Sequence, residues 1–199
     1  MAIKFQYNKT ALQDLNKQLR VRRRAVPILK NKEAALRAEV KRARDHAQEL
    51  DERLRTQMTD YEGIVRLWNE FDPALVSIAE VQLSVQKIAG IPTPVLEDIR
   101  FEVPEFSLFN KPYWFAQGID ILKKLSTLAI EREVFLRKMH LLDYARKKTT
   151  QKLNLYEKVQ IPDYEDAILK IKRFLEDEEN LSKSAQKIVK NRLEAMNEI

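Results

Sequence analysis

Cysteine is absent from this chain of 199 residues, and glycine and histidine are scarce. The absence of cysteine excludes a disulfide framework and thiolate metal sites, and it fits a reducing compartment. The three glycines, Gly63, Gly90 and Gly118, do not form a phosphate-binding loop. The two histidines, His46 and His140, stand alone and lack the spacing of a transition-metal site. We therefore predict no catalytic, cofactor-binding or metal-binding residue.

Long apolar runs are also missing. No stretch approaches the roughly 20 apolar residues that a helix needs to span a bilayer. The first residues, Met-Ala-Ile-Lys-Phe-Gln, lack the apolar core of a secretory signal. We expect a soluble intracellular protein that does not insert into a membrane.

Apolar residues at coiled-coil spacing fill two long stretches near the two ends of the chain, residues 12–68 and 121–188. In the first stretch these residues recur in steps of three and four throughout, and we call this series of positions the seam. Its only polar members are Arg22, Glu33 and Gln57. A strict seven-residue repeat predicts a left-handed supercoil against a partner helix. This helix would be roughly 90 Å long, whereas a compact globule of this size has a radius of gyration of about 16 Å. The sequence therefore favours an extended helical protein.

The second stretch repeats the seam but slips in phase near Pro162, and a new register begins at Tyr164. Such a stutter locally unwinds a supercoil. A proline inside a helix also removes a backbone donor and costs roughly 3 kcal/mol. Pro27 is a similar defect in the first stretch, and an antiparallel pair would place both prolines near the same end. The pattern indicates either a bent or loosened segment there or two tolerated kinks.

The residues between these stretches contain several breakers, which divide the chain into residues 1–71, 72–112 and 113–199. Asp72-Pro73 predicts the start of a short helix over residues 73–89, because a 3.6-residue period places Ile78, Val81, Val85 and Ile88 on one face. Within residues 95–109, mostly apolar residues at odd positions alternate with charged residues at even positions, and Pro104 interrupts the alternation. This pattern predicts a β-hairpin.

The predicted fold class is thus mainly α. A long antiparallel two-helix coiled coil forms from the N- and C-terminal regions, with a short helix and a β-hairpin in the middle of the chain. The three parts make one extended domain.

Charge is unevenly distributed along the chain. Residues 1–55 contain 15 Lys and Arg against seven acids, whereas residues 60–120 contain four against ten. Residues 121–199 are basic again, with 17 against 13. The densest basic cluster is Arg20, Arg22, Arg23 and Arg24, which fits a solvated helix face or a contact with an acidic protein surface. Nucleic acid is a less favoured partner, because no nucleic-acid-binding motif accompanies the charge.

Two stretches of the sequence resemble one known family. The second helical stretch contains Arg146-Lys-Lys-Thr-Thr-Gln-Lys-Leu-Asn154, then Glu157, Ile161-Pro162 and a helix rich in Ile, Lys, Arg and Glu over residues 168–179. The first contributes spaced residues, namely Leu12, Leu15, Leu19, Val21, Arg24, Leu29, Lys30, Lys32, Leu36, Glu39 and Val40. These residues, in their order along the chain, resemble those of the D subunits of the vacuolar- and archaeal-type rotary ATPases and their bacterial relatives. Ala25, Pro27 and Leu155-Tyr156 depart from the family pattern, and residues 72–109 are the least alike.

The resemblance implies a non-catalytic central stalk subunit, the rotor shaft. Such a shaft couples ATP hydrolysis or synthesis in a catalytic head to rotation and ion transport. The implied partners are the catalytic and non-catalytic head subunits, the small companion of the shaft (the F subunit of the stalk), and the socket above the membrane ring (the C or d subunit). The implied location is cytoplasmic and peripheral to the membrane. ATP would bind on the head, so no cofactor is expected on this chain.

Two groups of residues are candidate contact sites under this interpretation. The first, for contact with the head, comprises Arg20, Arg22, Arg23, Arg24, Lys170, Lys172 and Arg173. The second, for contact with the companion subunit or for setting the helix register, comprises Thr149, Thr150, Gln151 and Asn154.

Two other classes of protein remain open alternatives. These are a nucleic-acid-binding helical hairpin and a chaperone-like scaffold of the prefoldin type. Neither explains the Thr-Thr-Gln-Lys-Leu-Asn run and its Ile-Pro neighbour.

Overall fold

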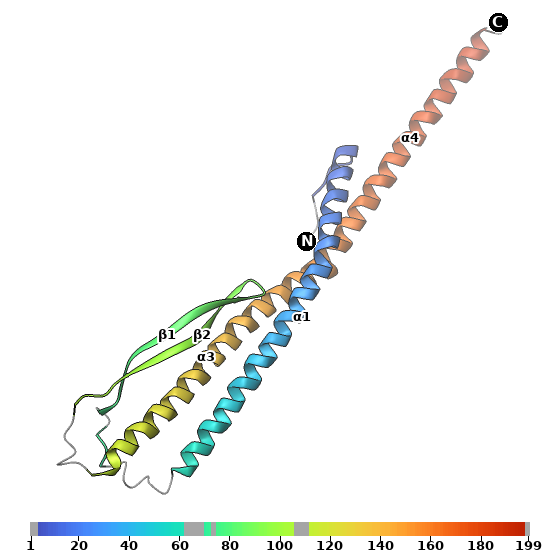
Figure 1. Cartoon of the computed structure of the whole chain (residues 1–199). Helices are drawn as coiled ribbons and strands as arrows, with labels where there is room; N and C mark the ends of the chain where they lie inside the picture. The colour runs from blue at the N-terminus through green and yellow to red at the C-terminus, as the bar shows by residue number, and fades with distance from the viewer. Residues whose placement is uncertain (1–3, 62–69, 73–74, 106–111, 198–199) are drawn as a thin grey trace. The chain divides into compact units, whose positions relative to one another are not determined.

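The computed structural model describes residues 4–61, 70–72, 75–105 and 112–197 (Figure 1). The elements follow the chain in the order α1 (Lys9–Asp60), β1 (Ser77–Ile88), β2 (Ile91–Glu102), α3 (Trp114–Leu155), the π-helical segment η4 (Tyr156–Gln160) and α4 (Ile161–Asn197). The predicted class is confirmed, because long helices near both ends of the chain flank an antiparallel hairpin. Residues 62–68 of the first predicted seam and residues 106–109 of the predicted hairpin lie outside the described residues. The position of the hairpin predicted within residues 95–109 is wrong, because residues 91–102 form one strand that pairs with residues 77–88.

Contacts divide the chain into a terminal unit, residues 1–31 and 149–199, and a central unit, residues 32–148. In the terminal unit the predicted seam forms a core between α1 and α4, in which Ile171 is fully buried. The chain before α1 closes this core, because Phe5 packs against it and the ring of Tyr7 lies 4.9 Å from that of Phe174. The buried members of this core are Leu15, Leu19, Tyr164, Ala167, Ile168 and Ile171.

In the central unit α1 packs against α3 through Leu36, Val40 and Leu142. Leu36 and Leu142 are fully buried, and truncating a side chain in such a place to alanine costs about 2–5 kcal/mol. Ile88 and Ile91, at the turn end of the hairpin, pack on the same cluster. This contact fixes the turn of the hairpin against the helices.

A second cluster in the central unit joins the beginning of α3 to the residues that precede β1. Phe71, Leu75, Phe115 and Ile119 are its buried members, and Trp114 packs against them. The ring of Phe115 is 5.2 Å from that of Phe71 and 4.9 Å from that of Trp114. Aromatic side chains therefore anchor the other end of the hairpin.

The predicted short helix over residues 73–89 is wrong, because residues 77–88 form strand β1. The apolar residues Ile78, Val81, Val85 and Ile88 fit a helical face, but all four are β-branched and favour a strand. β1 pairs antiparallel with β2 from Ser77↔Glu102 to Ile88↔Ile91. Pairing with a segment further along the chain therefore overrides the helical period.

Ala89 and Gly90 form the two-residue turn of the hairpin. Both residues have positive φ, 49° for Ala89 and 80° for Gly90. This combination is that of a type I′ turn, which matches the twist of the flanking strands and favours Asn-Gly. Alanine in the left-handed region costs roughly 1–2 kcal/mol relative to its ordinary conformation, so the turn is strained at Ala89.

We expect Ala89→Asn to stabilise the protein by up to about 1 kcal/mol, because asparagine tolerates the left-handed conformation better than alanine. The midpoint of urea unfolding, followed by circular dichroism, measures the change. Gly90→Ala is the matched control and should lower the midpoint, since it introduces a second strained residue. A lower midpoint for Ala89→Asn would contradict the turn assignment.

Candidate partner-contact surfaces

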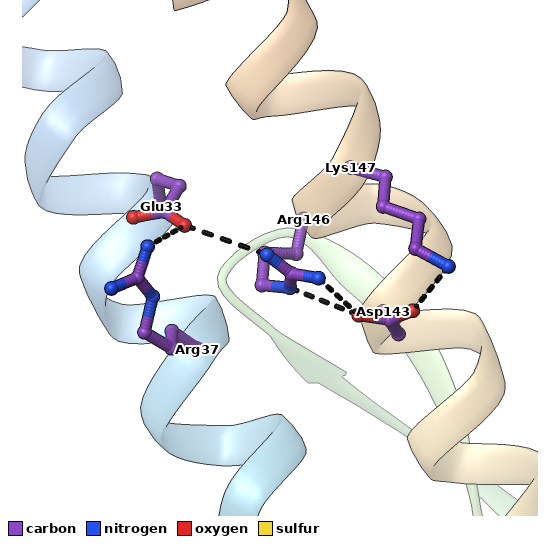
Figure 2. A network of polar contacts seen from close by, with 5 residues as sticks. All are labelled: Glu33, Arg37, Asp143, Arg146 and Lys147. Atoms are coloured by element: carbon purple, nitrogen blue, oxygen red, sulfur yellow. Dashed lines mark hydrogen bonds and ion pairs between the residues drawn. The ribbon is translucent and has the colours of Figure 1, made fainter.

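Charged residues in the predicted seam of the central unit pair with each other across the helices (Figure 2). Glu33 of α1 is only 9% exposed, and its Oε1 accepts a hydrogen bond from Arg37 Nη2 at 2.9 Å. The same oxygen lies 3.8 Å from Nη1 of Arg146 on α3. Two of the polar residues in the apolar seam thus neutralise each other. A buried charge without its partner is strongly unfavourable, so the contact selects one register of the two helices.

Arg146 is itself held in place by Asp143. Arg146 Nη2 and Nε lie 2.7 Å and 2.9 Å from Asp143 Oδ1, and Lys147 Nζ lies 2.9 Å from the other carboxylate oxygen. The hydrogen bond from Lys147, followed by that from Arg146, holds the pKa of Asp143 below its ordinary value. The carboxylate therefore stays ionised and orients Arg146 toward Glu33.

A second ion pair crosses the same helices further along. Arg132 Nε of α3 lies 2.7 Å from Asp51 Oδ1 of α1. The residue number rises on α1, from Glu33 to Asp51, as it falls on α3, from Arg146 to Arg132. The helices of the central unit are therefore antiparallel, as predicted.

Arg22, which the sequence placed in the head-contact group, is used inside the terminal unit. Its Nε donates to Gln160 Oε1 at 2.6 Å, and its guanidinium carbon lies 4.4 Å from the centre of the Tyr164 ring. The Tyr164 hydroxyl donates to Gln18 Oε1 at 2.6 Å. Arg22 is half-buried by these contacts. Its side chain therefore joins the two helices and is less available to a partner protein.

The other three arginines of this cluster fall into two groups, one paired and one exposed. Arg23 lies 2.6 Å from Glu165 Oε1 across the helices. Arg20 and Arg24 are exposed, and no described residue forms a hydrogen bond or an ion pair with either side chain. These two arginines are the members of the cluster that are open to a partner.

The predicted cations of α4 lie further along the terminal unit. Lys170, Lys172 and Arg173 are exposed, and Lys170 forms an ion pair of 3.6 Å with Asp166 on its own helix. Their level on α4 follows from Ile171, which packs in the core with Leu15. The structure therefore places these cations about one to two helical turns along the axis from Arg20 and Arg24, rather than in one patch with them.

The Thr-Thr-Gln-Lys-Leu-Asn run occupies the last turns of α3. Thr149 and Thr150 are half-buried, whereas Gln151 and Asn154 are exposed. The run therefore presents two polar side chains to solvent and two toward the protein. Both predicted roles, contact with a companion and setting of the register, stay predictions.

The predicted phase slip near Pro162 corresponds to the π-helical segment η4. The N–H of Ile161 bonds to the carbonyl of Tyr156, five residues back, which widens the helix by one residue. Pro27 lies within the continuous helix α1 at the same level as Pro162, because Arg23 and Lys30, on either side of Pro27, form ion pairs with Glu165 and Glu157, on either side of Pro162. The predicted juxtaposition of the two prolines is thus confirmed.

Within the part of the chain that the structure describes, no three His, Cys, Asp or Glu side chains converge as metal ligands would. None of the described helices has the length and apolarity required to cross a membrane.

We expect Asp143→Asn to destabilise the chain at pH 7 by about 0.5–1 kcal/mol, because the ion pairs that orient Arg146 are weakened. A carboxylate with a lowered pKa contributes stability above its unfolded pKa and loses it as pH falls through the folded value. The difference between the proteins should therefore shrink toward acid pH. Urea midpoints measured from pH 7 to pH 3 test this, with exposed Asp45→Asn as control. A difference that does not vary with pH would contradict it.

Comparison with known proteins gives one consistent result. A family model described as the D subunit of ATP synthase matches residues 11–191. The V-type ATP synthase D subunit of Borreliella burgdorferi is 28% identical over 193 residues, which cover 96% of this chain and 95% of that protein. The proteins of the same name from Chlamydia trachomatis and Chlamydia muridarum are 27% and 28% identical over 174 residues, which cover 85% of this chain and 86% of each relative. Since the family match extends over most of the sequence, the chain belongs to the family of ATP synthase D subunits.

Proposed function

We propose that this chain is the central stalk, or rotor shaft, of a V-type ATPase/ATP synthase. It couples ATP hydrolysis or synthesis in the catalytic head to rotation and to ion transport across the membrane. The observation that supports this role is the pairing of long antiparallel helices whose seams contain cross-helix charge contacts. A shaft must transmit torque, so its helices must not slide past each other. Glu33–Arg146 and Asp51–Arg132 oppose sliding in the central unit, because a shift of either helix separates the charges.

In this role the chain is not catalytic. ATP binds and reacts on the head subunits. This chain presents to them a surface that is different on each of its sides. Its partners are the catalytic and non-catalytic head subunits, the companion stalk subunit and the socket subunit above the membrane ring. Its place is on the cytoplasmic side, peripheral to the membrane.

The exposed arginines of the terminal unit suit contact with acidic groups of the head. Arg20 and Arg24 are exposed and have no ion-pair partner among the described residues, so they can approach a negatively charged wall without first breaking an internal contact. Arg22 and Arg23 bond to Gln160 and Glu165 and hold the helices together instead. The basic surface thus combines positions that stabilise the shaft and positions that are available to a partner.

Co-expression with the head subunits from the same genome tests the proposed function. We expect a stable complex with one copy of this chain per hexameric head, and ATPase turnover that depends on its presence. Native mass spectrometry and an ATPase assay measure the two properties. A chain that binds no head subunit, and instead self-assembles or retains nucleic acid at near-physiological salt, would exclude the shaft role.

Reversing the two open arginines should weaken assembly. We expect Arg20→Glu/Arg24→Glu to lower the affinity for the head by about tenfold or more, and the loss to shrink at high ionic strength, because surface charges act mainly through steering and are screened by salt. Titration of labelled chain into the head at two salt concentrations measures this effect.

Lys41→Glu/Arg44→Glu is the charge-matched control. Both residues are exposed on α1, but they belong to the central unit. An equal loss of affinity in this control would show that net charge alone is responsible. An unchanged affinity in Arg20→Glu/Arg24→Glu would remove these arginines from the head contact.

A further inference from the structure

The terminal unit has ion pairs on one side and exposed apolar residues on the other. Arg23 and Lys30 of α1 are seven residues apart, so they share one flank of that helix. They pair across the helices with Glu165 and Glu157, each at 2.6 Å. These two ion pairs mark one side of the plane that contains the two helix axes.

Four apolar side chains lie on the side without these ion pairs. On α1, Val21 and Ile28 each precede a paired cation by two residues, and they are 61% and 68% exposed. On the other helix, Leu155 and Val159 precede and follow Glu157 by two residues, and they are exposed as well. Two residues turn a helix by roughly half a circle, so all four side chains point away from the ion pairs. We call these four residues the apolar face of the terminal unit.

The apolar face is made by both helices at one level. The pair of Lys30 with Glu157 fixes that level. Because the helices are antiparallel, Ile28, two residues before Lys30, and Val159, two residues after Glu157, lie side by side along the axis. Exposed apolar residues that occur singly need no explanation, but a set on two packed helices forms a patch of the kind that binds partners.

The backbone beside the apolar face restricts how a partner can bind. The face belongs to α1, α3 and η4, whose N–H and C=O groups are mostly used within the helices. An added strand would find no ladder there, whereas a helix has its own backbone bonds satisfied and needs only side-chain contact. The apolar residues are seven apart on α1 and four apart on the other helix, which is the spacing of helix ridges. The face therefore suits an amphipathic helix.

Cations without a carboxylate partner flank the apolar face. Arg24 lies one turn from each apolar residue of α1, and Lys152 and Lys158 each lie one turn from Leu155. All three cations are exposed, and none forms an ion pair with a described residue. A partner that covers the apolar face must therefore offer negative charge to them.

The acids nearest to this side do not neutralise the three cations. Asp163 is half-buried and already has a partner. Asp14 lies two turns beyond Val21, further from the face than any of the three cations. The charge that surrounds the apolar face is therefore positive.

This positive charge also argues against two other occupants. A second copy of the chain would bring the same cations together, which like-charge repulsion opposes. Nucleic acid would meet the cations, but bases bind by stacking on aromatic rings, and the four residues of the face are aliphatic. An acidic protein helix satisfies both the apolar residues and the cations.

We propose that the apolar face of the terminal unit binds an acidic amphipathic helix of another subunit of the assembled V-type ATPase. The apolar residues of that helix cover Ile28 and Val159, and its carboxylates meet Arg24, Lys152 and Lys158. The proposal rests on the proposed function, because the helix belongs to another subunit. It adds to that function a second element, η4, and a chemical class for the partner.

Because the chain has no cysteine, a single introduced thiol can report on this face. Ile28→Cys places a thiol in the apolar face. Leu169→Cys is the matched control, since Leu169 is exposed and lies one turn from Glu165, on the side of the ion pairs. The probe is the ATPase assembled around each variant from the subunits of the same genome. We expect maleimide to label position 28 about tenfold or more slower in the complex than in the free chain, because only an accessible thiolate reacts. Position 169 should change much less.

A photoreactive maleimide at position 28 identifies the covering segment by crosslinking and mass spectrometry. We expect an acidic peptide with apolar residues three and four apart. Lys152→Glu/Lys158→Glu should lower the crosslink yield by about tenfold, because it reverses the charge that selects the partner. Lys152→Arg/Lys158→Arg keeps the charge and should retain the yield.

Five results would overturn the inference. If the chain enters the complex but position 28 labels as fast as in the free chain, the face is uncovered and the shaft role is unaffected. Equal protection at positions 28 and 169 would indicate that the terminal unit is enclosed on all sides. A crosslink to a second copy, or to a segment without negative charge, would exclude the acidic helix. Protection of the free chain by phosphatidylglycerol vesicles would assign the face to a lipid surface. A chain that never enters the complex contradicts both this occupant and the proposed function.

Discussion

The contact between Glu33 and Arg146 determines how the central unit is aligned. Both side chains interrupt an otherwise apolar seam, and each is desolvated by the same helices that it joins. Desolvation makes the pair a poor source of stability compared with two apolar residues, but a shift of register would separate the two charges and leave the buried Glu33 with Arg37 alone. The pair therefore acts against every wrong register more than it favours the right one. The buried Leu36 and Leu142 supply the stability, and the charges supply the alignment.

In the terminal unit the arginine of the seam contacts neutral side chains. Arg22 meets a neutral amide, Gln160, and an aromatic ring, Tyr164, rather than a carboxylate. This pairing occurs at η4, where the helix is widened by one residue ahead of Pro162. Pro162 cannot donate a hydrogen bond, and its ring clashes with the carbonyl four residues back, so a widened turn accommodates it. Ion pairs from Arg23 to Glu165 and from Lys30 to Glu157 cross the helices beside it, so charge also aligns the terminal unit.

The sequence predicted the features that depend on local periodicity. The seam, its antiparallel pairing, the slip near Pro162 and the mainly α class all follow from the spacing of apolar residues and prolines. The short helix failed, because Ile78, Val81, Val85 and Ile88 satisfy a helical period, while their strand partners lie on a segment further along the chain. The site was predicted only as a group of charges. Sequence spacing cannot show that Arg22 turns inward to Gln160 while Arg20 and Arg24 stay exposed, because that division depends on the residues of the opposite helix.

The hairpin protects its two outer edges by different means. Prolines in an edge strand are usually read as protection against aggregation. In this hairpin they protect one strand only, since Pro92 and Pro94 occupy β2 and no proline occurs in β1. Both edges of a two-stranded sheet need such protection, and β1 has it in another form. Register shifts interrupt its pairing between Ile78 and Glu80 and between Gln82 and Leu83, and Lys87 places a cation near its turn end. Because bulges twist a strand and a lysine resists desolvation, β1 disfavours a further strand without a proline.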